Sequence, residues 1–458
     1  KKRVGAFTSF ATGATSHADS GEFRRSGRVR AGTPSNERAT QPGGTSLVAR
    51  LEETSANLLT RQFCSVISHV SLLLSHFSYT LQHFLNEHKT RKYKAIMSFE
   101  RLNIKNMKGY KPGEQIEGPD VIKLNTNENP YPASPEVAAA LKNLDTESLR
   151  RYPSPLADSF RKAAAKLNNV TEENIIPTKG GDELLRLAIT TFVDTDEKIV
   201  VTQPSYTLYP VLTDVQGCVL IEVPLQHDWS MPSDFEAYLN SSGAKMCILV
   251  NPHAPTGRLL EANYLSQLAD SFQGILVIDE AYVDFVDPKF QYNSVPLIKS
   301  KDNVLILRSL SKGYSLAGLR FGYGIGAQSL LKPMIYKTRD SYNTDTVAQR
   351  LATAALESVD YARGTWDRVR KSRASLTDGL KQIGLNTVPS QSNFVFCQVP
   401  SPISAKDLYE GLKQRNILVR YFDQDGLKDN LRISVGSDSE NAVLLEAIRS
   451  LINTPDLD

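Results

Sequence analysis

Four short runs of apolar and β-branched residues set the strongest limit on the fold of this chain. They occupy residues 198–202 (KIVVT), 246–250 (MCILV), 275–279 (ILVID) and 303–308 (NVLILR). Continuous apolar runs of this length are typical of strands that are buried on both faces of a parallel sheet. Stretches with helical spacing lie between them, for example at 183–192 and 261–272. The alternation predicts an α/β fold with a mainly parallel, doubly wound sheet.

The C-terminal part of the chain has a different pattern, in which long helical stretches dominate. Two of these, at 368–383 and 405–415, are combined with short apolar runs at 393–398 and 430–435. This pattern predicts a second, smaller α+β domain. The expected organisation is an extension (1–96), an N-terminal arm that forms part of the small domain (97–139), a large domain (140–345) and a C-terminal small domain (346–458).

The first 96 residues differ from the rest in charge. They contain 14 Lys and Arg against 6 Asp and Glu, whereas residues 97–458 contain 39 against 44. The net charge of +3 is therefore the sum of a basic extension and a mildly acidic remainder of the chain. We expect residues 1–96 to be a non-catalytic segment, disordered or non-native, that activity does not need; organelle targeting is the alternative. Residues 62–86 carry no charge, but their His, Ser and Gln residues argue against a membrane-spanning helix.

The four cysteines are scattered along the chain. Cys64, Cys218, Cys247 and Cys397 form no CxxC pair. Their spacing predicts neither a zinc site nor a disulfide framework, and we expect no bound metal. Free thiols of this kind fit a reducing compartment, which we take to be the cytoplasm.

A lysine that follows the last of the four apolar runs is the first candidate for chemistry. Lys312 has Ser309 and Ser311 before it and Arg320 after it. A lysine in apolar surroundings near a second cation has a lowered pKa, which makes its amine a usable nucleophile for a Schiff base. Hydroxyl groups and an arginine suit a phosphate group. Together these residues predict the phosphorylated aldehyde cofactor pyridoxal 5′-phosphate (PLP).

Other positions meet the remaining requirements of this cofactor. Asp279 ends the run 275–279 and can supply the counter-charge for the protonated pyridine nitrogen, while Tyr282 can bond the phenolic oxygen. Gly181 and Asp182 open a helical stretch whose N–H groups and dipole can receive the phosphate. Asn251 directly follows the run 246–250, at the edge of the sheet where such folds bind ligands.

Nine motifs, in this order, resemble those of the fold-type I, class I/II PLP-dependent aminotransferases, and within that family those of the histidinol-phosphate aminotransferases. The resemblance covers about residues 101–453. The motifs are LNTNENPYPASPEV (124–137), RYP (151–153), KGGDELL (179–185), QPSYTLY (203–209), NPHAPTG (251–257), DEAYVDF (279–285), SLSKGYSLAGLR (309–320), QSNFVF (391–396) and LRISVG (431–436).

The resemblance implies a role in cofactor binding for each matching residue. Lys312 would form the covalent linkage to PLP and later carry the proton between the reacting carbons. Asp279 would pair with the pyridine nitrogen, and Tyr282 would bond the phenolic oxygen. Tyr206 would stack on the ring. The phosphate would be held by Gly181, Asp182, Ser309, Ser311 and Arg320.

The resemblance also implies how substrates and a partner subunit are used. Arg432 would hold the substrate carboxylate as a bidentate fork, and Arg420 with Tyr131 would address the phosphate end of the substrate. Tyr152 would reach into the site of the other subunit, so the active unit would be a homodimer. The implied reaction is a ping-pong transamination between L-histidinol phosphate and 2-oxoglutarate in histidine biosynthesis, without nucleic acid or membrane partners.

One position departs from the pattern of the family. The usual motif N-P-x-N-P-[TS]-G has a second Asn that bonds the phenolic oxygen of the cofactor, and this chain has Ala254 there. Because alanine donates no hydrogen bond, Tyr282 must make that contact alone or share it with Asn251, His253 or water. We expect a retained but weaker cofactor contact.

Other functions remain open at this stage. An aromatic amino-acid aminotransferase shares almost every motif, and a threonine-phosphate decarboxylase uses the same cofactor. A transcription regulator that carries an aminotransferase-like domain would use the basic extension to bind DNA. Residues 1–50, however, show no helical periodicity of the kind that a recognition helix needs.

Overall fold

The computed structural model describes residues 70–85, 99–116 and 118–453. The chain separates into two units, Lys1–Met97 and Ser98–Asp458. In the first unit, residues 70–85 form a helix whose side chains are exposed. No helix within the described ranges is long and apolar enough to span a membrane. The predictions for residues 1–69, which include Cys64 and any targeting segment, lie outside the described residues.

A seven-stranded sheet forms the centre of the second unit, with the strand order β2-β8-β7-β6-β5-β3-β4. Only β8 runs against its neighbours, and the other pairings are parallel. The predicted α/β fold with a mainly parallel sheet is therefore confirmed. The strands are β2 (Ile175–Thr178), β3 (Lys198–Gln203), β4 (Val219–Pro224), β5 (Met246–Val250), β6 (Ile275–Asp279), β7 (Val304–Ser309) and β8 (Gly322–Gly326).

The four apolar runs of the sequence correspond to β3, β5, β6 and β7, whereas β2, β4 and β8 were not predicted. The sequence of β8 is GYGIG, and glycine has a low strand propensity. Close packing explains these glycines: a Cβ at Gly322 would lie 2.9 Å from the Arg308 carbonyl oxygen, and one at Gly324 would lie 2.8 Å from the Ile176 side chain.

Helices cover both faces of the sheet, because the side chains of alternate strand residues point to opposite faces and contribute to two separate hydrophobic cores. In β3, Val200 belongs to one core, and Ile199 and Val201 belong to the other. The first core is covered by α4 (Asp158–Asn168), α7 (Phe235–Ser241), α8 (Ala262–Ser271) and α10 (Thr346–Glu357). The second core is covered by α5 (Gly181–Phe192), α6 (Leu208–Gln216) and α9 (Gln328–Pro333).

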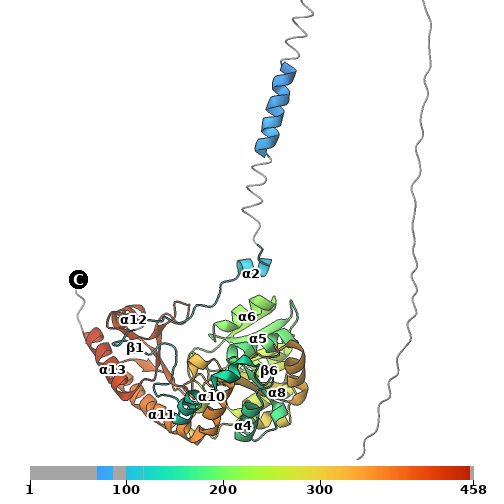
Figure 1. The fold of residues 1–458 in the computed structure, drawn as a ribbon. Coiled ribbons are helices and arrows are strands. Elements are labelled where there is room, and N and C mark those ends of the chain that lie inside the picture. Colours follow the sequence, from blue (N-terminus) through green and yellow to red (C-terminus); the bar gives the residue numbers. More distant parts are fainter. Residues whose placement is uncertain (1–69, 86–98, 117, 454–458) are drawn as a thin grey trace, which may run out of the picture. The chain divides into compact units, whose positions relative to one another are not determined.

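A smaller antiparallel sheet of order β12-β13-β10-β9 has its own core, which confirms the predicted α+β part. Figure 1 shows this part, in orange and red, beside the layered body that contains α5 and α8. Its elements are α11 (Val359–Gln382), β9 (Asn386–Thr387), β10 (Phe394–Gln398), α12 (Ala405–Gln414), β11 (Ile417–Leu418), β12 (Arg420–Tyr421), β13 (Asn430–Ser434) and α13 (Asp438–Asn453).

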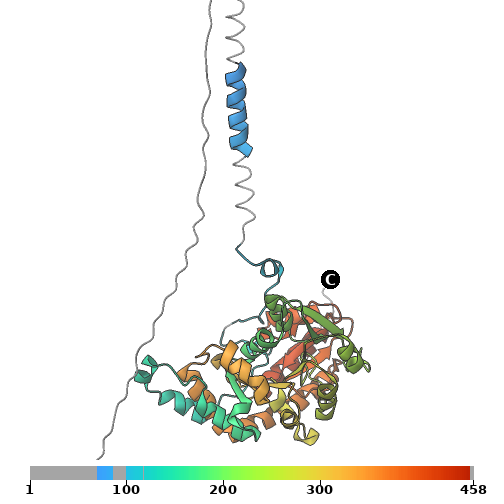
Figure 2. The ribbon, with the colours of Figure 1, turned by 90° about the vertical axis from the view of Figure 1, so that its right-hand side faces the viewer.

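The segment that precedes the large domain packs with these C-terminal elements. Strand β1 (Ile122–Lys123) pairs in parallel with β11, and Figure 1 shows β1 close to α12 and α13. Helix α2 (Leu102–Asn106) instead lies against the end of α6, where Asn103 donates to the Asp214 carbonyl oxygen (2.7 Å). The turned view in Figure 2 shows the teal segment with α3 (Pro135–Lys142) and α4 at one end of this unit. The N-terminal arm thus spans both domains.

Candidate active site

A cavity of about 290 Å³ lies at the carboxyl ends of β3, β5, β6 and β7, where open α/β sheets bind their ligands. The small domain and the segment 110–127 supply its remaining walls. Eleven residues that were predicted from the sequence line this one cavity: Gly181, Asp182, Tyr206, Asp279, Tyr282, Ser309, Ser311, Lys312, Arg320, Arg420 and Arg432.

The carboxylate of Asp279 lies at the bottom of the cavity, at the end of β6. Its Oδ2 accepts a hydrogen bond from Tyr209 Oη (2.8 Å), and its Oδ1 accepts one from the backbone of Ala281 (3.1 Å). Burial raises the pKa of Asp279 to about 6, against the effect of these two hydrogen bonds. A buried carboxylate of this kind is stabilised in its charged form by a cationic partner, such as a protonated ring nitrogen.

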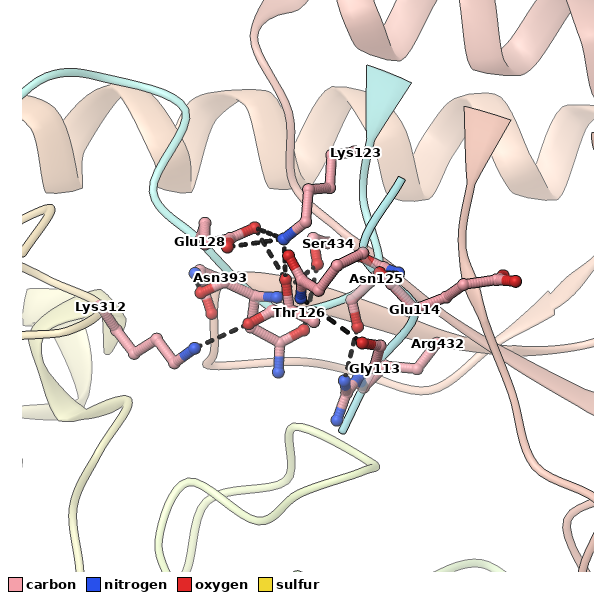
Figure 3. Close-up of polar contacts among 12 residues, drawn as sticks. Gly113, Glu114, Lys123, Asn125, Thr126, Glu128, Lys312, Asn393, Arg432 and Ser434 are labelled. Atoms are coloured by element: carbon pink, nitrogen blue, oxygen red, sulfur yellow. Dashed lines mark hydrogen bonds and ion pairs between the residues drawn. The ribbon is translucent and has the colours of Figure 1, made fainter. Parts of the chain in front are cut away.

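The amine of Lys312 lies across the cavity and donates a hydrogen bond to the carbonyl oxygen of Thr126 (2.7 Å). Figure 3 shows the side chain of Lys312 extended toward this segment. Burial lowers the pKa of Lys312 to about 8, and the positive charge of Arg432 acts in the same direction. The lysine therefore meets the condition for a nucleophilic amine near neutral pH.

One wall of the cavity offers donors for a phosphate group. Helix α5 begins at Gly181, so its first N–H groups have no partner within the helix. Arg320 donates to Ser311 Oγ (3.3 Å) and forms an ion pair with Asp182 (3.0 Å). Gly180, with φ of 80°, lets Arg320 approach, because a Cβ there would lie 3.0 Å from Nη2 of Arg320. The geometry brings hydroxyls, a guanidinium and a helix start together.

Two tyrosines flank the centre of the cavity. Tyr206 makes edge contacts with Tyr110 and Tyr209, at centroid distances of 6.0 and 5.6 Å. Tyr282 makes an edge contact with Phe394 (5.1 Å). Burial raises the pKa of both Tyr206 and Tyr282, so both phenols remain protonated at neutral pH. An aromatic ring that entered between them would meet an apolar face and a hydroxyl donor.

Two arginines lie opposite one another on neighbouring strands of the small sheet. Arg420 of β12 is the register partner of Arg432 of β13, and both line the cavity. Arg432 donates from Nη2 to the carbonyl oxygen of Asn125 (3.0 Å), but its buried Nε has no hydrogen-bond partner among the described residues. Like charges directly opposite each other are destabilising. The pair therefore suits a carboxylate or a phosphate that lies between the two guanidinium groups.

Three predicted residues do not line the cavity. The amide of Asn251 is used within its own loop, where it donates to and accepts from the backbone of Leu260 (3.0 and 2.7 Å), so its position does not support a contact with the cofactor. Tyr131 packs against the guanidinium of Arg368, which lies 3.7 Å from the ring centroid. Tyr131 is not among the residues that line the cavity, whereas Arg420 is.

Tyr152, the third predicted residue that does not line the cavity, lies on the surface. Its side chain is 80% exposed and stacks on Tyr342 at a centroid distance of 4.5 Å. Tyr152 therefore does not contribute to the cavity of its own chain.

The loop that departs from the family pattern has its polar groups engaged elsewhere. Ala254 lines the cavity but offers no donor. The ring nitrogens of His253 lie 2.8 Å from Thr256 Oγ1 and 3.0 Å from the Pro204 carbonyl oxygen. Burial lowers the pKa of His253 to about 4, so the ring is neutral. Neither His253 nor Asn251 can take over the missing contact.

Several lining residues were not predicted from the sequence. The segment 110–127 contributes Tyr110, Gln115, Asn125, Thr126 and Asn127. Asn125, Thr126 and Asn127 belong to the motif LNTNENPYPASPEV, which could have indicated them, whereas Tyr110 lies outside the nine motifs. Within the described ranges, no group of His, Cys, Asp and Glu side chains is arranged to hold a metal ion.

Comparison with known proteins assigns this chain to a family. Residues 119–448 match the aminotransferase class I and II family. The chain belongs to this family. A histidinol-phosphate aminotransferase of Nostoc sp. is 41% identical over 362 residues, which are 79% of this chain and 100% of the relative. The corresponding enzyme of Trichormus variabilis is 41% identical over 358 residues, 78% of this chain and 100% of the relative.

Solved structures agree with the fold expected of an aminotransferase of this family. The histidinol-phosphate aminotransferase of Sinorhizobium meliloti, in complex with pyridoxal-5′-phosphate, superposes with a TM-score of 0.70 at 23% identity, over 78% of this chain and 99% of that one. A double mutant of the Thermus thermophilus aspartate aminotransferase superposes with a TM-score of 0.63 at 23% identity, over 72% and 92%. The fold-type I architecture is therefore confirmed.

Proposed function

We propose that this aminotransferase uses PLP to transfer an amino group between L-histidinol phosphate and 2-oxoglutarate. The observation that carries this proposal is the 41% sequence identity over the entire length of two histidinol-phosphate aminotransferases. The pair formed by Arg420 and Arg432 supports it from the geometry, because a phosphate of about two negative charges would balance two guanidinium groups.

The residues of the cavity fit PLP. The α5 N-terminus at Gly181, with Ser309, Ser311 and Arg320, would hold the phosphate, and Asp279 would face the pyridine nitrogen. Tyr206 and Tyr282 would line the space around the PLP ring. When bound, PLP supplies an aldehyde that condenses with amines and a ring that withdraws electrons from the reacting carbon.

Lys312 would hold and move the proton at the reacting carbon. Its amine, with a pKa lowered to about 8 by burial, is neutral in a substantial fraction of molecules near pH 7.5 and can accept a proton there. The Thr126 carbonyl oxygen would keep Nζ within the cavity, since it accepts a hydrogen bond from it at 2.7 Å. Asp279, held by Tyr209, would stabilise the positive charge on the ring nitrogen.

Arg432 would bind both substrates at the same place. Glutamate presents a carboxylate where L-histidinol phosphate presents a phosphate ester, so one site must accept both groups. The unpartnered Nε of Arg432 and the adjacent Arg420 offer a fork for the planar carboxylate and a second cation for the phosphate. Positioning by these two arginines would bring the amino group of either donor toward Lys312.

A homodimer is part of this proposal. Tyr152 is too exposed to serve the cavity of its own chain, and together with Tyr342 it offers an aromatic surface to a second copy. Tyr152 would enter the cavity of the partner subunit from there. A reducing compartment such as the cytoplasm would keep the described cysteines free, as Cys218, Cys247 and Cys397 are here.

A half-reaction screen tests the function. Purified protein that carries PLP should lose its visible absorption with L-histidinol phosphate and with L-glutamate, and should recover it with 2-oxoglutarate. Much faster conversion by phenylalanine or tyrosine would favour an aromatic aminotransferase instead. The variant Lys312→Ala should bind PLP without the absorption of a lysine-linked cofactor, and an unchanged spectrum would contradict the role of Lys312.

A further inference from the structure

Three consecutive residues of the N-terminal arm contact three side chains of the proposed site. The carbonyl oxygen of Asn125 accepts from Arg432 (3.0 Å), and that of Thr126 accepts from Lys312 (2.7 Å). Figure 3 shows Lys312 and Arg432 reaching this segment from opposite sides. The third contact joins two side chains: Nδ2 of Asn127 donates to Oη of Tyr282 at 3.0 Å. Only this third contact depends on which side chain the arm carries.

The amide of Asn127 is held in one orientation. Ser434 Oγ accepts from the backbone N–H of Asn127 (2.9 Å) and donates to its Oδ1 (3.1 Å). With Oδ1 occupied in this way, the NH₂ group must face Tyr282. Asn393 donates to the carbonyl oxygen of Asn127 (2.8 Å) and fixes the backbone. Asn127 is 1% exposed and has φ of 57°, a conformation that Asn tolerates better than most residues.

This arrangement decides where the hydroxyl hydrogen of Tyr282 points. A phenol has one hydrogen to donate, and its oxygen already accepts the Asn127 amide. No protein acceptor receives the Tyr282 hydrogen within the part of the chain that the structure describes. The charged and titratable groups that face Tyr282 are Arg432, Asp279 and Tyr110, together with Tyr206 and Tyr209. The hydrogen is thus available to a ligand in the cavity.

We propose that Asn127 is a positioning residue that aims the hydroxyl hydrogen of Tyr282 at the phenolic oxygen of bound PLP. The contact explains how the site works with Ala254 in place of the usual asparagine: the missing donor is replaced by a better oriented one. Asn127 itself does not touch the cofactor and acts through Tyr282. The inference rests on the proposed function, since it requires PLP in this cavity.

The orientation of Tyr282 has a measurable effect on the linkage between Lys312 and PLP. A hydrogen bond donated to the phenolic oxygen stabilises negative charge there, so this oxygen holds the proton of the neighbouring linkage nitrogen less strongly. The linkage then has a low pKa. Loss of the Asn127 contact should raise that pKa by about 0.5 to 1 unit, the amount that one hydrogen bond supplies.

The experiment is a pH titration of the visible absorption of the PLP-loaded protein, without substrate. Asn127→Gly removes the amide and tolerates the positive φ, and we expect the linkage pKa to rise by about 0.5 to 1 unit. Asn169→Gly is the matched control, because Asn169 also has a positive φ (54°) but is exposed at the end of α4 and does not line the cavity. This control should titrate like the parent protein.

A double-mutant cycle shows whether Asn127 acts through Tyr282. Tyr282→Phe should raise the linkage pKa by itself, and adding Asn127→Gly to it should cause no further change. Equal shifts from Asn127→Gly in the presence and absence of the Tyr282 hydroxyl would overturn the proposal, as would an unshifted titration of a folded Asn127→Gly protein. If Asn127→Gly does not fold, Asn127→Ser takes its place with the same expectation. A parent protein that shows no PLP absorption would instead refute the proposed function.

Discussion

At the scale of single residues, the reactivity of Lys312 can be tested through its pKa. Burial and Arg432 lower the pKa of Lys312 to about 8 from its usual value of 10.5. Because only the neutral amine attacks an aldehyde, the rate of PLP incorporation into the cofactor-free protein should rise with pH and level off above about pH 8. Stopped-flow absorbance across a pH series measures this rate. A rate that continues to rise toward pH 10.5 would mean that Lys312 has the pKa of an ordinary lysine.

Glu128 provides a control for that experiment. Its carboxylate raises the pKa of Lys312, opposing the effects of burial and Arg432, and it also forms an ion pair with Lys123. Figure 3 shows Lys123 and Glu128 on the same segment as Thr126. Glu128→Gln should therefore move the midpoint of the rate profile to lower pH. A shift to higher pH would contradict the electrostatic explanation.

The position of Ala254 leads to a second prediction. Ala254→Asn would add an amide donor to the wall of the cavity. PLP affinity, measured by equilibrium dialysis, should increase by about fivefold, since one added hydrogen bond supplies about 1 kcal/mol. Ala254→Val adds volume without a donor and should not tighten binding. An unchanged affinity of the Asn variant would mean that Tyr282 alone already satisfies the oxygen.

The sequence was informative for some of these residues and silent for others. Asp279 could be predicted because it ends an apolar run, and Lys312 because it follows one, since the carboxyl ends of parallel strands meet at one edge. Asn251 satisfies the same rule, but its amide bonds its own loop, which spacing does not reveal. The contact of Asn127 with Tyr282 joins positions 155 residues apart, and no local pattern encodes it.

At the scale of secondary-structure elements, a buried ion pair joins the two strands that carry the proposed chemistry. Glu280, directly after β6, lies 2.7 Å from Nε of Arg308 in β7. Its other oxygen accepts from Tyr292 (2.6 Å) and Ser294 (2.5 Å). Glu280→Gln removes the carboxylate in direct contact with Arg308 and leaves Asp284 as the remaining acidic group that acts on this buried cation, so the free energy of unfolding should fall by up to about 3 kcal/mol. Urea denaturation of the cofactor-free protein measures this loss.

Two control variants distinguish the effect of breaking the ion pair from the effect of changing the side chains. Glu280→Gln combined with Arg308→Met removes both charges and keeps a side-chain oxygen for Tyr292 and Ser294. It should destabilise less than Glu280→Gln alone, because Arg308 is then no longer buried without its direct partner. Asp360→Asn breaks the exposed ion pair with Arg363 and should leave stability unchanged. If the double variant is the least stable of the three, the stability comes from packing around these side chains and not from their charges.

Elements with strong hydrophobic patterns were predictable, and those defined by distant partners were not. The strands β5 and β6 are buried along their whole length and read as apolar runs. In edge strand β4 only Val223 is fully buried, and β8 consists mainly of glycine, so neither strand has the expected pattern. Strand β1 is two residues long and forms only because it pairs with β11. Its own sequence therefore does not indicate it.

At the scale of the whole molecule, the proposed dimer would make each cavity dependent on two chains. Lys312 lies inside the cavity of its own chain, whereas Tyr152 lies on the surface, against Tyr342. If Tyr152 serves the partner subunit, the variants Lys312→Ala and Tyr152→Ala are each impaired at both sites of their dimers. A mixed dimer contains one site with an intact lysine from one chain and an intact tyrosine from the other.

Mixing the two variants therefore tests the shared site. After denaturation and refolding together, random pairing gives mixed dimers with one complete site, and transaminase activity should return to about a quarter of the parent value. Refolding each variant alone controls for recovery of the fold. If the mixture only averages the two separate activities, Tyr152 serves its own chain or none, because a residue confined to its own subunit cannot complement a lysine that is missing from the other.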